Sequence, residues 1–316
     1  MKPSVFVYEH LSGGAAGSDA GRDDAAMLAQ GLAMRDALCT DLAQQGEVMV
    51  SCASAAGLGA PAGATCVRPA TGESAFDFVR QQSRAHALCW IVAPECDGLL
   101  AQLCDIVGPE RWIGCEAAAI RLASSKRRTL QRLAAHGLVT PLAFEGDPHI
   151  ARWVAKPDDG AGATATRLHG ARDAAQADAA ARSGAAVVEP WVEGEPMSLS
   201  LLCAGGGAET LSVNRQHIEV DAAGSVSYAG VQIDALRSDD ARAAALRDCG
   251  LHVARAMPGL RGYVGVDLVW HARRGPVVIE VNPRLTCAWV GLSAALARPL
   301  AAEILALFLE RRHEEA

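Results

Sequence analysis

The stretch Val277-Val278-Ile279-Glu280-Val281-Asn282-Pro283-Arg284 sets a carboxylate and an amide two residues apart in a run of strand-forming residues. Successive side chains of an extended chain point to opposite faces, so Glu280 and Asn282 should share one face while their apolar neighbours pack into the other. Pro283 cannot donate to a sheet ladder, so we expect the strand to end there and Arg284 to lie in a loop. Oxygen ligands beside an arginine suit magnesium and phosphate. Mg²⁺ takes only a few oxygens from the protein and leaves its other coordination sites to water and substrate phosphates.

A second apolar run with one acid lies upstream, at Gly265-Val266-Asp267-Leu268-Val269-Trp270. The residues between the two runs, His271-Ala272-Arg273-Arg274-Gly275-Pro276, are typical of a turn, so we expect an antiparallel hairpin with Asp267 near Glu280. For either acid alone, the better explanation is an ordinary strand residue that caps the strand or faces solvent. Together with Arg284, the two acids favour a site for Mg²⁺, with Mn²⁺ as an alternative.

The composition limits the class of protein. The chain has 316 residues, of which 50% are hydrophobic and 21% charged, which predicts a globular protein of two or three packed units. Its net charge of −7 gives no electrostatic reason to expect nucleic acid as a partner. Residues Met1 to His10 do not fit a signal peptide, and the cysteines form no Cys-x-x-Cys pair, so we expect reduced thiols and a cytoplasmic location.

A long apolar segment near the C-terminus, from Thr286 to Leu309, is interrupted by Arg298, Pro299 and Glu303. A membrane-spanning helix needs about 20 predominantly apolar residues in a row. We therefore predict a buried C-terminal helix and no membrane partner, and a homo-oligomer remains compatible with the sequence.

Strand and helix patterns alternate in the N-terminal part of the chain. This β-α-β-α-β order is typical of a parallel sheet covered by helices, which we expect to end near Ala118. The predicted elements are strands at Ser4–Tyr8, Val48–Val50 and Ala87–Val92, helices at Asp24–Gln45 and Ala75–Arg84, and a loop at Ala53–Thr65.

Polar residues follow the first and last of these strands. Glu9 and Glu95 come where the strands end, and Ser12-Gly13-Gly14 lets the backbone approach a ligand closely. Ligands of open α/β sheets bind at the carboxyl ends of the strands. We therefore expect substrate at this edge, with an ordinary solvated turn as the alternative.

Lysine is rare, and two of the three lysines lie in positions that suit phosphate binding. Lys126 falls in a predicted helix from Ala119 to Gly137, where its basic neighbours are explained by solvent exposure. Lys156 lies on a predicted strand that leads into Asp158-Asp159-Gly160-Ala161-Gly162-Ala163-Thr164. A lysine beside a glycine loop holds polyphosphate through a point charge and backbone N–H groups.

The same loop matches the pattern Gly-x-Gly-x-x-Ala of dinucleotide-binding proteins. That fingerprint needs a helix opening on the glycines and an acid at a strand end about 20 residues later. Here the segment from Thr164 to Leu168 is short and contains β-branched residues, so it does not open a helix on the glycines. Asp178, the acid at the required distance, falls in an alanine-rich helical run from Ala171 to Ser183 instead of at a strand end. A nicotinamide-dependent oxidoreductase is therefore the less favoured alternative.

Three further segments suit a ligand. A strand that leaves the interior at Glu189 and continues as Pro190-Trp191-Val192 offers backbone groups and a flat apolar wall for adenine. Arg215 ends a polar strand and would bind a carboxylate or the γ-phosphate, unless it is an ordinary surface arginine. Trp289 would stack on an aromatic amine, unless it belongs to the core.

These motifs together resemble the ATP-grasp superfamily over residues 121–291. The resemblance implies an α/β ATP-grasp fold, with an N-terminal Rossmann-like parallel-sheet domain (1–118) before two α+β subdomains (119–190 and 191–316) that enclose ATP. It also implies roles for single residues. Lys126 and Lys156 would bind the ATP phosphates under the loop of Gly160 and Gly162, and Glu189, Trp191 and Val192 would bind adenine. Magnesium would be held by Asp267, Glu280 and Asn282, and the transferring phosphoryl group by Arg284.

Two positions depart from that family pattern. Many members have an acid where this chain has Ser125, and a ribose-binding glutamate where it has Pro196. Glu193 or Glu195 is the candidate replacement at the ribose.

Three short segments show a narrower resemblance, to the tyramine–glutamate ligase of methanofuran biosynthesis and its bacterial relatives. They are Val7–Gly14, Ala93-Pro94-Glu95 and Asn282–Thr286. This resemblance implies an ATP-dependent carboxylate–amine ligase that joins L-glutamate to tyramine or tyrosine in one-carbon cofactor synthesis. Under this hypothesis Arg284, Lys156 and Arg215 act in catalysis, and the acceptor lies by Glu9, Ser12, Gly13, Gly14 and Trp289. The other alternative is a nucleotide-binding regulator without turnover, and in each case the expected partners are small molecules.

Overall fold

The computed structural model describes residues 2–15, 22–160, 162–236 and 239–314. The chain forms two compact units. The first comprises Met1–Pro94, Leu99–Ala117 and Arg284–Ala316, and the second comprises Glu95–Gly98 and Ala118–Pro283. Along the chain, most of the second unit is therefore an insertion in the first. The domain boundaries predicted at residues 118 and 190 stay predictions.

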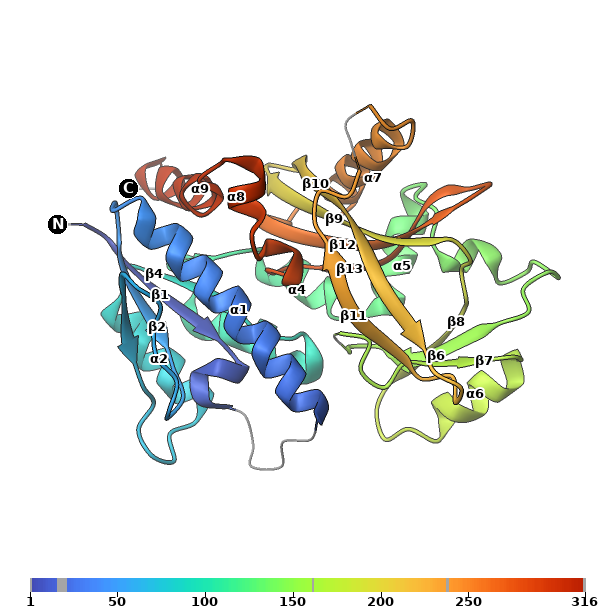
Figure 1. The fold of residues 1–316 in the computed structure, drawn as a ribbon, viewed down its shortest axis with the longest axis horizontal. Helices are drawn as coiled ribbons and strands as arrows, with labels where there is room; N and C mark the ends of the chain where they lie inside the picture. The colour runs from blue at the N-terminus through green and yellow to red at the C-terminus, as the bar shows by residue number, and fades with distance from the viewer. Residues whose placement is uncertain (1, 16–21, 161, 237–238, 315–316) are drawn as a thin grey trace. The chain divides into compact units, whose positions relative to one another are not determined.

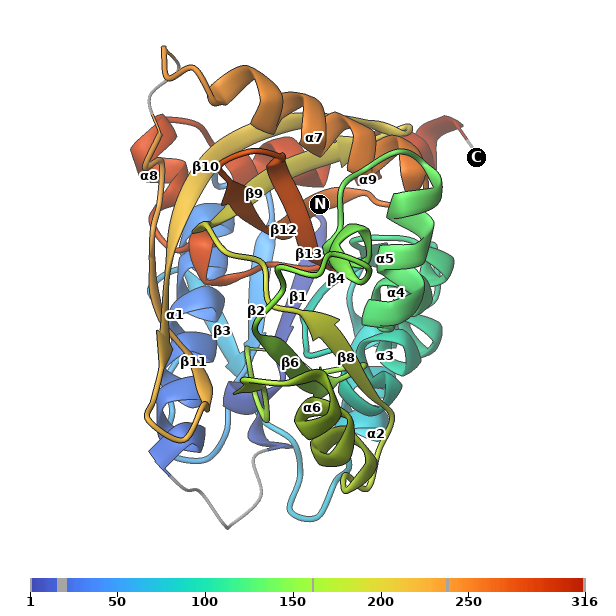
Figure 2. The same cartoon turned by 90° about the vertical axis from the view of Figure 1, so that its right-hand side faces the viewer.

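The first unit contains a five-stranded sheet with the order β3-β2-β1-β4-β5 and parallel pairing throughout. Helix α1 covers one face of this sheet, and α2 and α3 cover the other (Figures 1 and 2). Apolar strands such as β4, in which every residue is buried, are what a parallel sheet with two covered faces requires. The elements are β1 (Ser4–Glu9), η1 (Leu11–Ala15), α1 (Arg22–Gln44), β2 (Met49–Ala53), β3 (Ala64–Val67), α2 (Ala75–Ala85), β4 (Leu88–Val92), α3 (Leu99–Val107) and β5 (Trp112–Ile113).

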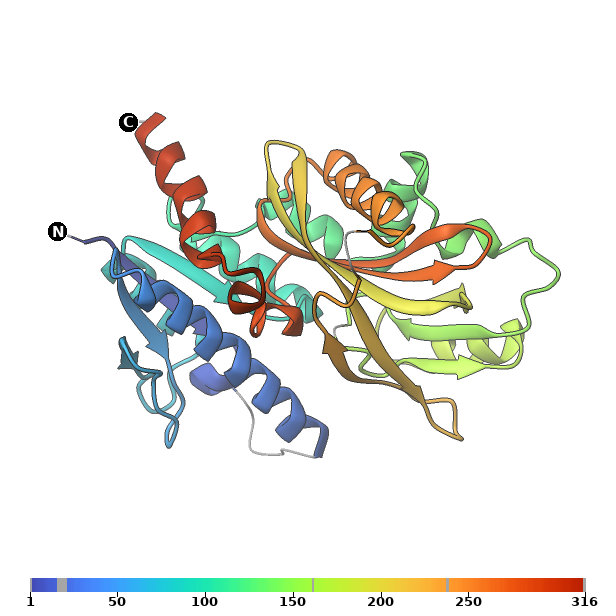
Figure 3. The same cartoon turned by 45° about the horizontal axis from the view of Figure 1, so that its top comes forward.

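The C-terminal segment completes the first unit. Its elements are η4 (Cys287–Trp289), α8 (Leu292–Leu296) and α9 (Leu300–Glu314), and α9 packs on α1 (Figure 3). The Ser293 hydroxyl donates a hydrogen bond to Asp41 Oδ2 on α1 at 2.6 Å. The predicted buried C-terminal helix is confirmed, and in the part of the chain that the structure describes no helix is long and apolar enough to cross a bilayer.

The second unit contains two antiparallel sheets. The smaller has the order β7-β6-β8, and the larger has the order β11-β10-β9-β12-β13. Helix α7 lies over one face of the larger sheet, where an added Cβ at Gly250 would lie 2.8 Å from the Leu201 side chain. The elements are η2 (Cys96–Gly98), α4 (Ala117–Ala123), α5 (Lys126–Ala135), η3 (Pro141–Phe144), β6 (Trp153–Pro157), β7 (Arg167–His169), α6 (Arg172–Ala180), β8 (Ala186–Pro190), β9 (Glu195–Ala204), β10 (Gly207–Val220), β11 (Val226–Gln232), α7 (Ala243–Ala256), β12 (Gly262–His271) and β13 (Gly275–Asn282).

Two local predictions were wrong. The single helix predicted from Ala119 to Gly137 is interrupted, because Ser125 is extended and its hydroxyl caps α5 by accepting from the Arg128 N–H at 3.2 Å. The loop predicted for residues 53–65 is present over residues 54–63, and the prediction was wrong only in missing strand β3, a short edge strand that pairs with β2. The remaining β-α alternation is confirmed, and with it the α/β fold.

Candidate active site

The β12–β13 hairpin brings the two acids together as predicted. Asp267 and Glu280 are direct cross-strand partners, and Gly265 pairs with Asn282. Asn282 is therefore on the same face as both acids, and its Nδ2 donates to Asp267 Oδ2 at 3.1 Å. Strand β13 ends at Asn282, immediately before Pro283, because proline cannot continue the ladder.

The acids continue a row of polar residues across the larger sheet. Asn214 on β10 pairs with Ser198 on β9, and Ser198 pairs with Asp267 on β12. Directly paired residues of antiparallel strands point to the same face. Ser198 and Asn214 are buried, and the Asn214 amide donates to the hydroxyls of Ser198 and Ser200 at 3.3 and 3.1 Å. This polar face is thus opposite to the apolar face under α7.

Gln216 also belongs to the polar face, and the sequence analysis missed it. Its Nε2 donates to Asp267 Oδ1 at 2.8 Å. The signal was present in the sequence, because Asn214-x-Gln216 repeats the spacing of Glu280-x-Asn282 in a strand. Both asparagines of the chain, Asn214 and Asn282, belong to this face.

Lys126 lies at the first turn of α5 with its ammonium group against this hairpin. Its Nζ is 2.9 Å from Glu280 Oε1 and also donates to the carbonyl oxygen of Gly160. The side chain is only 6% exposed. Burial alone would lower the pKa of Lys126, but the charges of Glu280, Glu95 and Glu189 outweigh burial and raise it. The lysine is therefore a fixed cation at neutral pH.

Lys156 forms a second buried ion pair in the smaller sheet. Its Nζ is 2.8 Å from Glu189 Oε2, and both residues are buried. Val187, the residue opposite Lys156, is two positions from Glu189 on β8, so the two side chains share a face. The other carboxylate oxygen, Glu189 Oε1, is buried and has no hydrogen-bond partner among the described residues.

The glycine loop between β6 and β7 has an unusual backbone. Gly162, Ala163 and Ala165 all have positive φ values, of 64°, 61° and 52°. For alanine this left-handed conformation is strained, and such strain clusters at ligand-binding segments. The described residues after Gly162 lead into strand β7 and form no helix, so the structural context of the dinucleotide fingerprint is missing. Ala161 lies outside the described residues.

Both ends of this loop are held by polar contacts. At its start, Asp158 accepts from the Ser125 hydroxyl at 2.7 Å and from the Arg127 N–H at 2.9 Å, which ties the loop to the first turn of α5. At its end, Arg182 donates to the carbonyl oxygen of Ala165 and to Asp178. Ser125, which departs from the family pattern, therefore links the loop to the helix that carries Lys126.

The tip of the β10–β11 hairpin also contacts this segment. The Leu168 N–H donates to the Gly224 carbonyl oxygen at 2.7 Å, and the Val226 N–H donates to the Thr166 carbonyl oxygen at 3.0 Å. Gly224 has a φ of 83°, and an added Cβ would collide with the Leu168 carbonyl oxygen. One hairpin thus connects the strand that follows the glycine loop with the strand that carries Gln216.

The predicted adenine segment lies beside an apolar cluster. Val192 is buried against Phe144 and Val277, with Ile279 packed at its side. The Trp191 N–H donates to the Arg152 carbonyl oxygen at 2.9 Å, so that N–H holds the segment in place.

Arg215 and Glu195 lie on the opposite face of the larger sheet from Asp267. Arg215 pairs with Met197, the neighbour of Ser198, and alternation directs it away from the polar face. Glu195 accepts from Arg215 Nε at 2.6 Å and from an Arg242 NH group at 2.5 Å. Glu193, the other ribose candidate, instead forms an exposed ion pair with Arg152. The structure therefore does not bring Arg215 together with the metal-site candidates.

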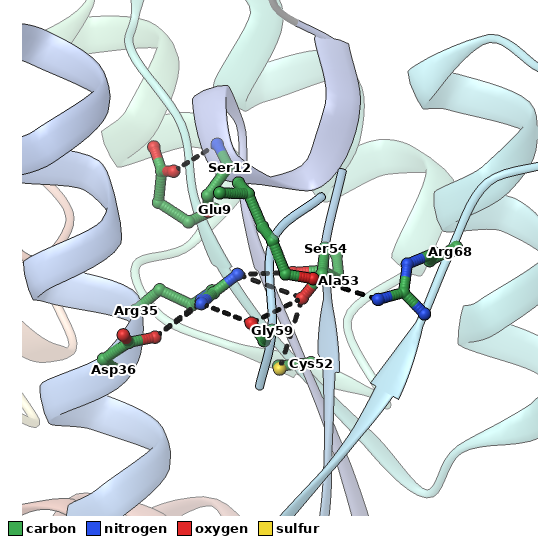
Figure 4. A network of polar contacts seen from close by, with 10 residues as sticks. Glu9, Ser12, Arg35, Asp36, Cys52, Ala53, Ser54, Gly59 and Arg68 are labelled. Carbon is green, nitrogen blue, oxygen red and sulfur yellow. Dashed lines mark hydrogen bonds and ion pairs between the residues drawn. The ribbon is translucent and has the colours of Figure 1, made fainter. Parts of the chain in front are cut away.

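The predicted substrate residues of the first unit are mostly buried. Glu9 is 4% exposed, and its carboxylate accepts from the Leu11 N–H at 3.2 Å and from the Ser12 N–H at 2.8 Å, of which Figure 4 shows the second. An added Cβ at Gly13 would lie 2.6 Å from the Tyr8 ring, and Gly14 has a φ of 106°. Glu9 therefore fixes the turn at the carboxyl end of β1. Ser12 Oγ is buried and has no hydrogen-bond partner among the described residues.

A buried arginine fixes the neighbouring loop at the same edge of the parallel sheet. Arg35 on α1 donates to the Ser54 hydroxyl at 3.0 Å and to the Gly59 carbonyl oxygen at 2.9 Å (Figure 4). Trp289 is fully buried, with its ring 6.1 Å from that of Trp90. Arg284 also belongs to the first unit, where it donates to the Leu285 carbonyl oxygen.

The donor set on the polar face fits a magnesium ion. Mg²⁺ prefers carboxylate and amide oxygens and shares its coordination with phosphates. Asp267, Glu280 and Asn282 supply such oxygens from adjacent strands. Among the residues that the structure describes, no three His, Cys, Asp or Glu side chains gather as a closed metal cage. Two carboxylates and one amide leave coordination positions of Mg²⁺ open to water and to phosphate oxygens.

Two buried lysines, a strained glycine loop and paired acids on adjacent strands are typical of proteins that bind nucleoside triphosphates. Comparison with known families agrees. The ATP-grasp domain matches residues 123–288, more than half of the chain, and the pre ATP-grasp 3 domain matches residues 47–120. The chain belongs to the ATP-grasp family. A search of curated proteins finds no match.

Solved structures share the fold at low sequence identity. A putative ATP-grasp superfamily protein from Archaeoglobus fulgidus has a TM-score of 0.71 and 22% identity, covering 96% of this chain and 88% of that one. An L-amino acid ligase from Bacillus licheniformis has a TM-score of 0.65 and 16% identity, covering 93% and 68%. The D-alanine–D-alanine ligase of Bacillus anthracis complexed with ATP has a TM-score of 0.65 and 15% identity, covering 99% and 100%. The predicted ATP-grasp fold is confirmed.

Proposed function

We propose that this protein is an ATP-dependent ligase that joins a carboxylate to an amine through an acyl phosphate. The observation that carries the proposal is the pair of buried lysines, each in an ion pair with a glutamate and both near a glycine loop. Membership of the ATP-grasp family and the ligases among its structural neighbours support an enzyme that forms a carbon–nitrogen bond.

The buried ion pairs suit a site that exchanges partners. A buried ammonium group needs a negative partner, and a phosphate oxygen serves as well as a carboxylate. On ATP binding, we expect phosphate oxygens to replace Glu280 at Lys126 and to bind Lys156 beside the glycine loop. Glu280 would then hold magnesium with Asp267 and Asn282. When bound, the metal neutralises charge on the phosphates.

Glu189 has a second role in this proposal. Its Oε1 is buried and has no hydrogen-bond partner among the described residues. This favours a ligand that donates a hydrogen bond to Oε1. The exocyclic amine of adenine is such a donor. The apolar cluster around Val192 and Phe144 would contact the face of the base.

The proposed reaction needs no protein nucleophile. A carboxylate oxygen attacks the γ-phosphorus, the bond to the β–γ bridging oxygen breaks, and ADP leaves. The amine then attacks the acyl carbon, and phosphate leaves with a proton from the nitrogen. The chain contributes binding, orientation and exclusion of water. We propose Arg284 as the group that binds the transferring phosphoryl group. Arg215 is a weaker candidate, because it lies on the opposite face of the larger sheet from Asp267.

For the substrates, we propose L-glutamate as the carboxylate and tyramine or tyrosine as the amine, in a methanofuran-type one-carbon cofactor pathway. The resemblance of Val7–Gly14 and Asn282–Thr286 to tyramine–glutamate ligases supports this proposal. The site would lie at the carboxyl edge of the parallel sheet, where ligands of open α/β sheets bind.

Two measurements test the proposal. At a hundredfold excess over Kd, a ligand stabilises a protein by roughly 2.7 kcal/mol, so MgATP should raise Tm by about 5 °C and NAD should leave it unchanged. ADP release should require both a carboxylate and an amine, with glutamate and tyramine the best pair. Stabilisation by NAD instead would favour an oxidoreductase. Binding of MgATP without ADP release from any pair would favour a regulator.

A further inference from the structure

Gln216 belongs to the polar face of the larger sheet but lies on a strand that is not adjacent to the hairpin of Asp267 and Glu280. It is on β10, and β9 separates β10 from the strand that carries Asp267. Its side chain nevertheless reaches Asp267 Oδ1 at 2.8 Å, while Asn282 donates to Oδ2 from the other side. The Asp267 carboxylate is thus held between two amide groups from different strands.

The chemistry of an amide donor decides what this contact does. A lysine or arginine at position 216 would neutralise Asp267 and compete with a metal, and an acid would repel it. An amide N–H fixes the plane of the carboxylate and leaves its full charge. A carboxylate can accept at about four positions, so two amide donors are compatible with metal ligation.

We infer that Gln216 is a positioning residue for the metal site, which orients Asp267 toward a magnesium ion bound with ATP phosphates. This inference rests on the proposed function. Partners that orient a metal ligand typically change metal affinity by 10- to 100-fold when they are removed. Gln216 acts through Asp267 and does not itself hold the metal.

The test measures metal affinity directly. Mn²⁺ binding in the presence of ADP is followed by electron paramagnetic resonance for the wild type, Gln216→Met and Gln216→Asn. Met keeps the length without the donor, and Asn keeps the amide but is too short to reach. We expect both variants to bind Mn²⁺ about 10-fold more weakly and to need more Mg²⁺ for half-maximal turnover.

The neighbouring residue supplies the control. His217 is exposed and points away from the polar face, so His217→Met should leave Mn²⁺ affinity unchanged. In an Asp267→Asn background, Gln216→Met should weaken Mn²⁺ binding no further, because its target is gone. If both Gln216 variants fold and bind Mn²⁺ as tightly as the wild type, the role of Gln216 is overturned and the metal site itself is not. Absence of Mn²⁺ binding in the wild type would overturn the metal site as well.

Discussion

The Lys156 ammonium group lies 2.8 Å from Glu189 Oε2, and neither side chain is more than 7% exposed. Removing one partner of a buried pair leaves an uncompensated charge, which typically costs 3–5 kcal/mol. Lys156 thus serves the fold of the smaller sheet as well as the proposed phosphate site.

Lys156→Met should therefore lower both stability and ATP binding, while Lys156→Met/Glu189→Gln should recover most of the stability and none of the ATP binding. The double variant removes both buried charges, and urea unfolding with ATP titration separates the two effects. Near wild-type ligation by the double variant would place the phosphate site elsewhere.

Asp267→Asn and Glu280→Gln should each lower kcat by far more than they weaken ATP binding. Metal ligands act most strongly as charge moves in the transition state. Steady-state kinetics at saturating Mg²⁺, beside equilibrium ATP binding, measures the difference. Unchanged kcat in both variants would remove these residues from the site.

Glu195 should make stability depend on pH in a defined direction. Burial raises the pKa of Glu195, but the hydrogen bonds from Arg215 and Arg242 outweigh burial and lower it below its ordinary value. Its contribution is therefore complete above the unfolded pKa and lost as pH falls through the lower folded value. Glu195→Gln should cost on the order of 1 kcal/mol at pH 7 and progressively less below about pH 4. Chemical unfolding across that range measures it, and a cost that is independent of pH would argue against the ion pairs.

Gly224→Ala should loosen the segment that follows the glycine loop. The added methyl group collides with the Leu168 carbonyl oxygen and so breaks the contact of the hairpin tip with β7. We expect faster hydrogen exchange at residues 162–170 and a several-fold higher KM for ATP. Gly206→Ala is the matched control, because Gly206 also has a positive φ but no atom near its Cβ position. Equal effects of both variants would mean that backbone strain alone is responsible.

The sequence predicts the β12–β13 hairpin well because every signal there is local. Alternation places Glu280 and Asn282 on one face, and Pro283 ends the strand where the structure ends it. The same reasoning was available for Asn214 and Gln216. The contact of Gln216 with Asp267, however, depends on the strand order β10-β9-β12, which no local pattern specifies.

Long-range partners account for the remaining differences. The Lys156–Glu189 pair requires β8 to lie beside β6, and the face of Arg215 follows from its register with Met197. The burial of Trp289 against Trp90 joins residues far apart in the chain. The sequence left core and ligand contact as alternatives for this tryptophan, since both use the same apolar surface.

The position of α9 on α1 bears on how the protein is made. Residues 118–283 must leave the ribosome before Arg284–Ala316 can join the first unit. At bacterial-like synthesis rates this delay is on the order of ten seconds, far longer than a helix needs to form. Throughout that interval α1 lacks its contacts with α9, so the packing of the first unit is not complete until Arg284–Ala316 has been made.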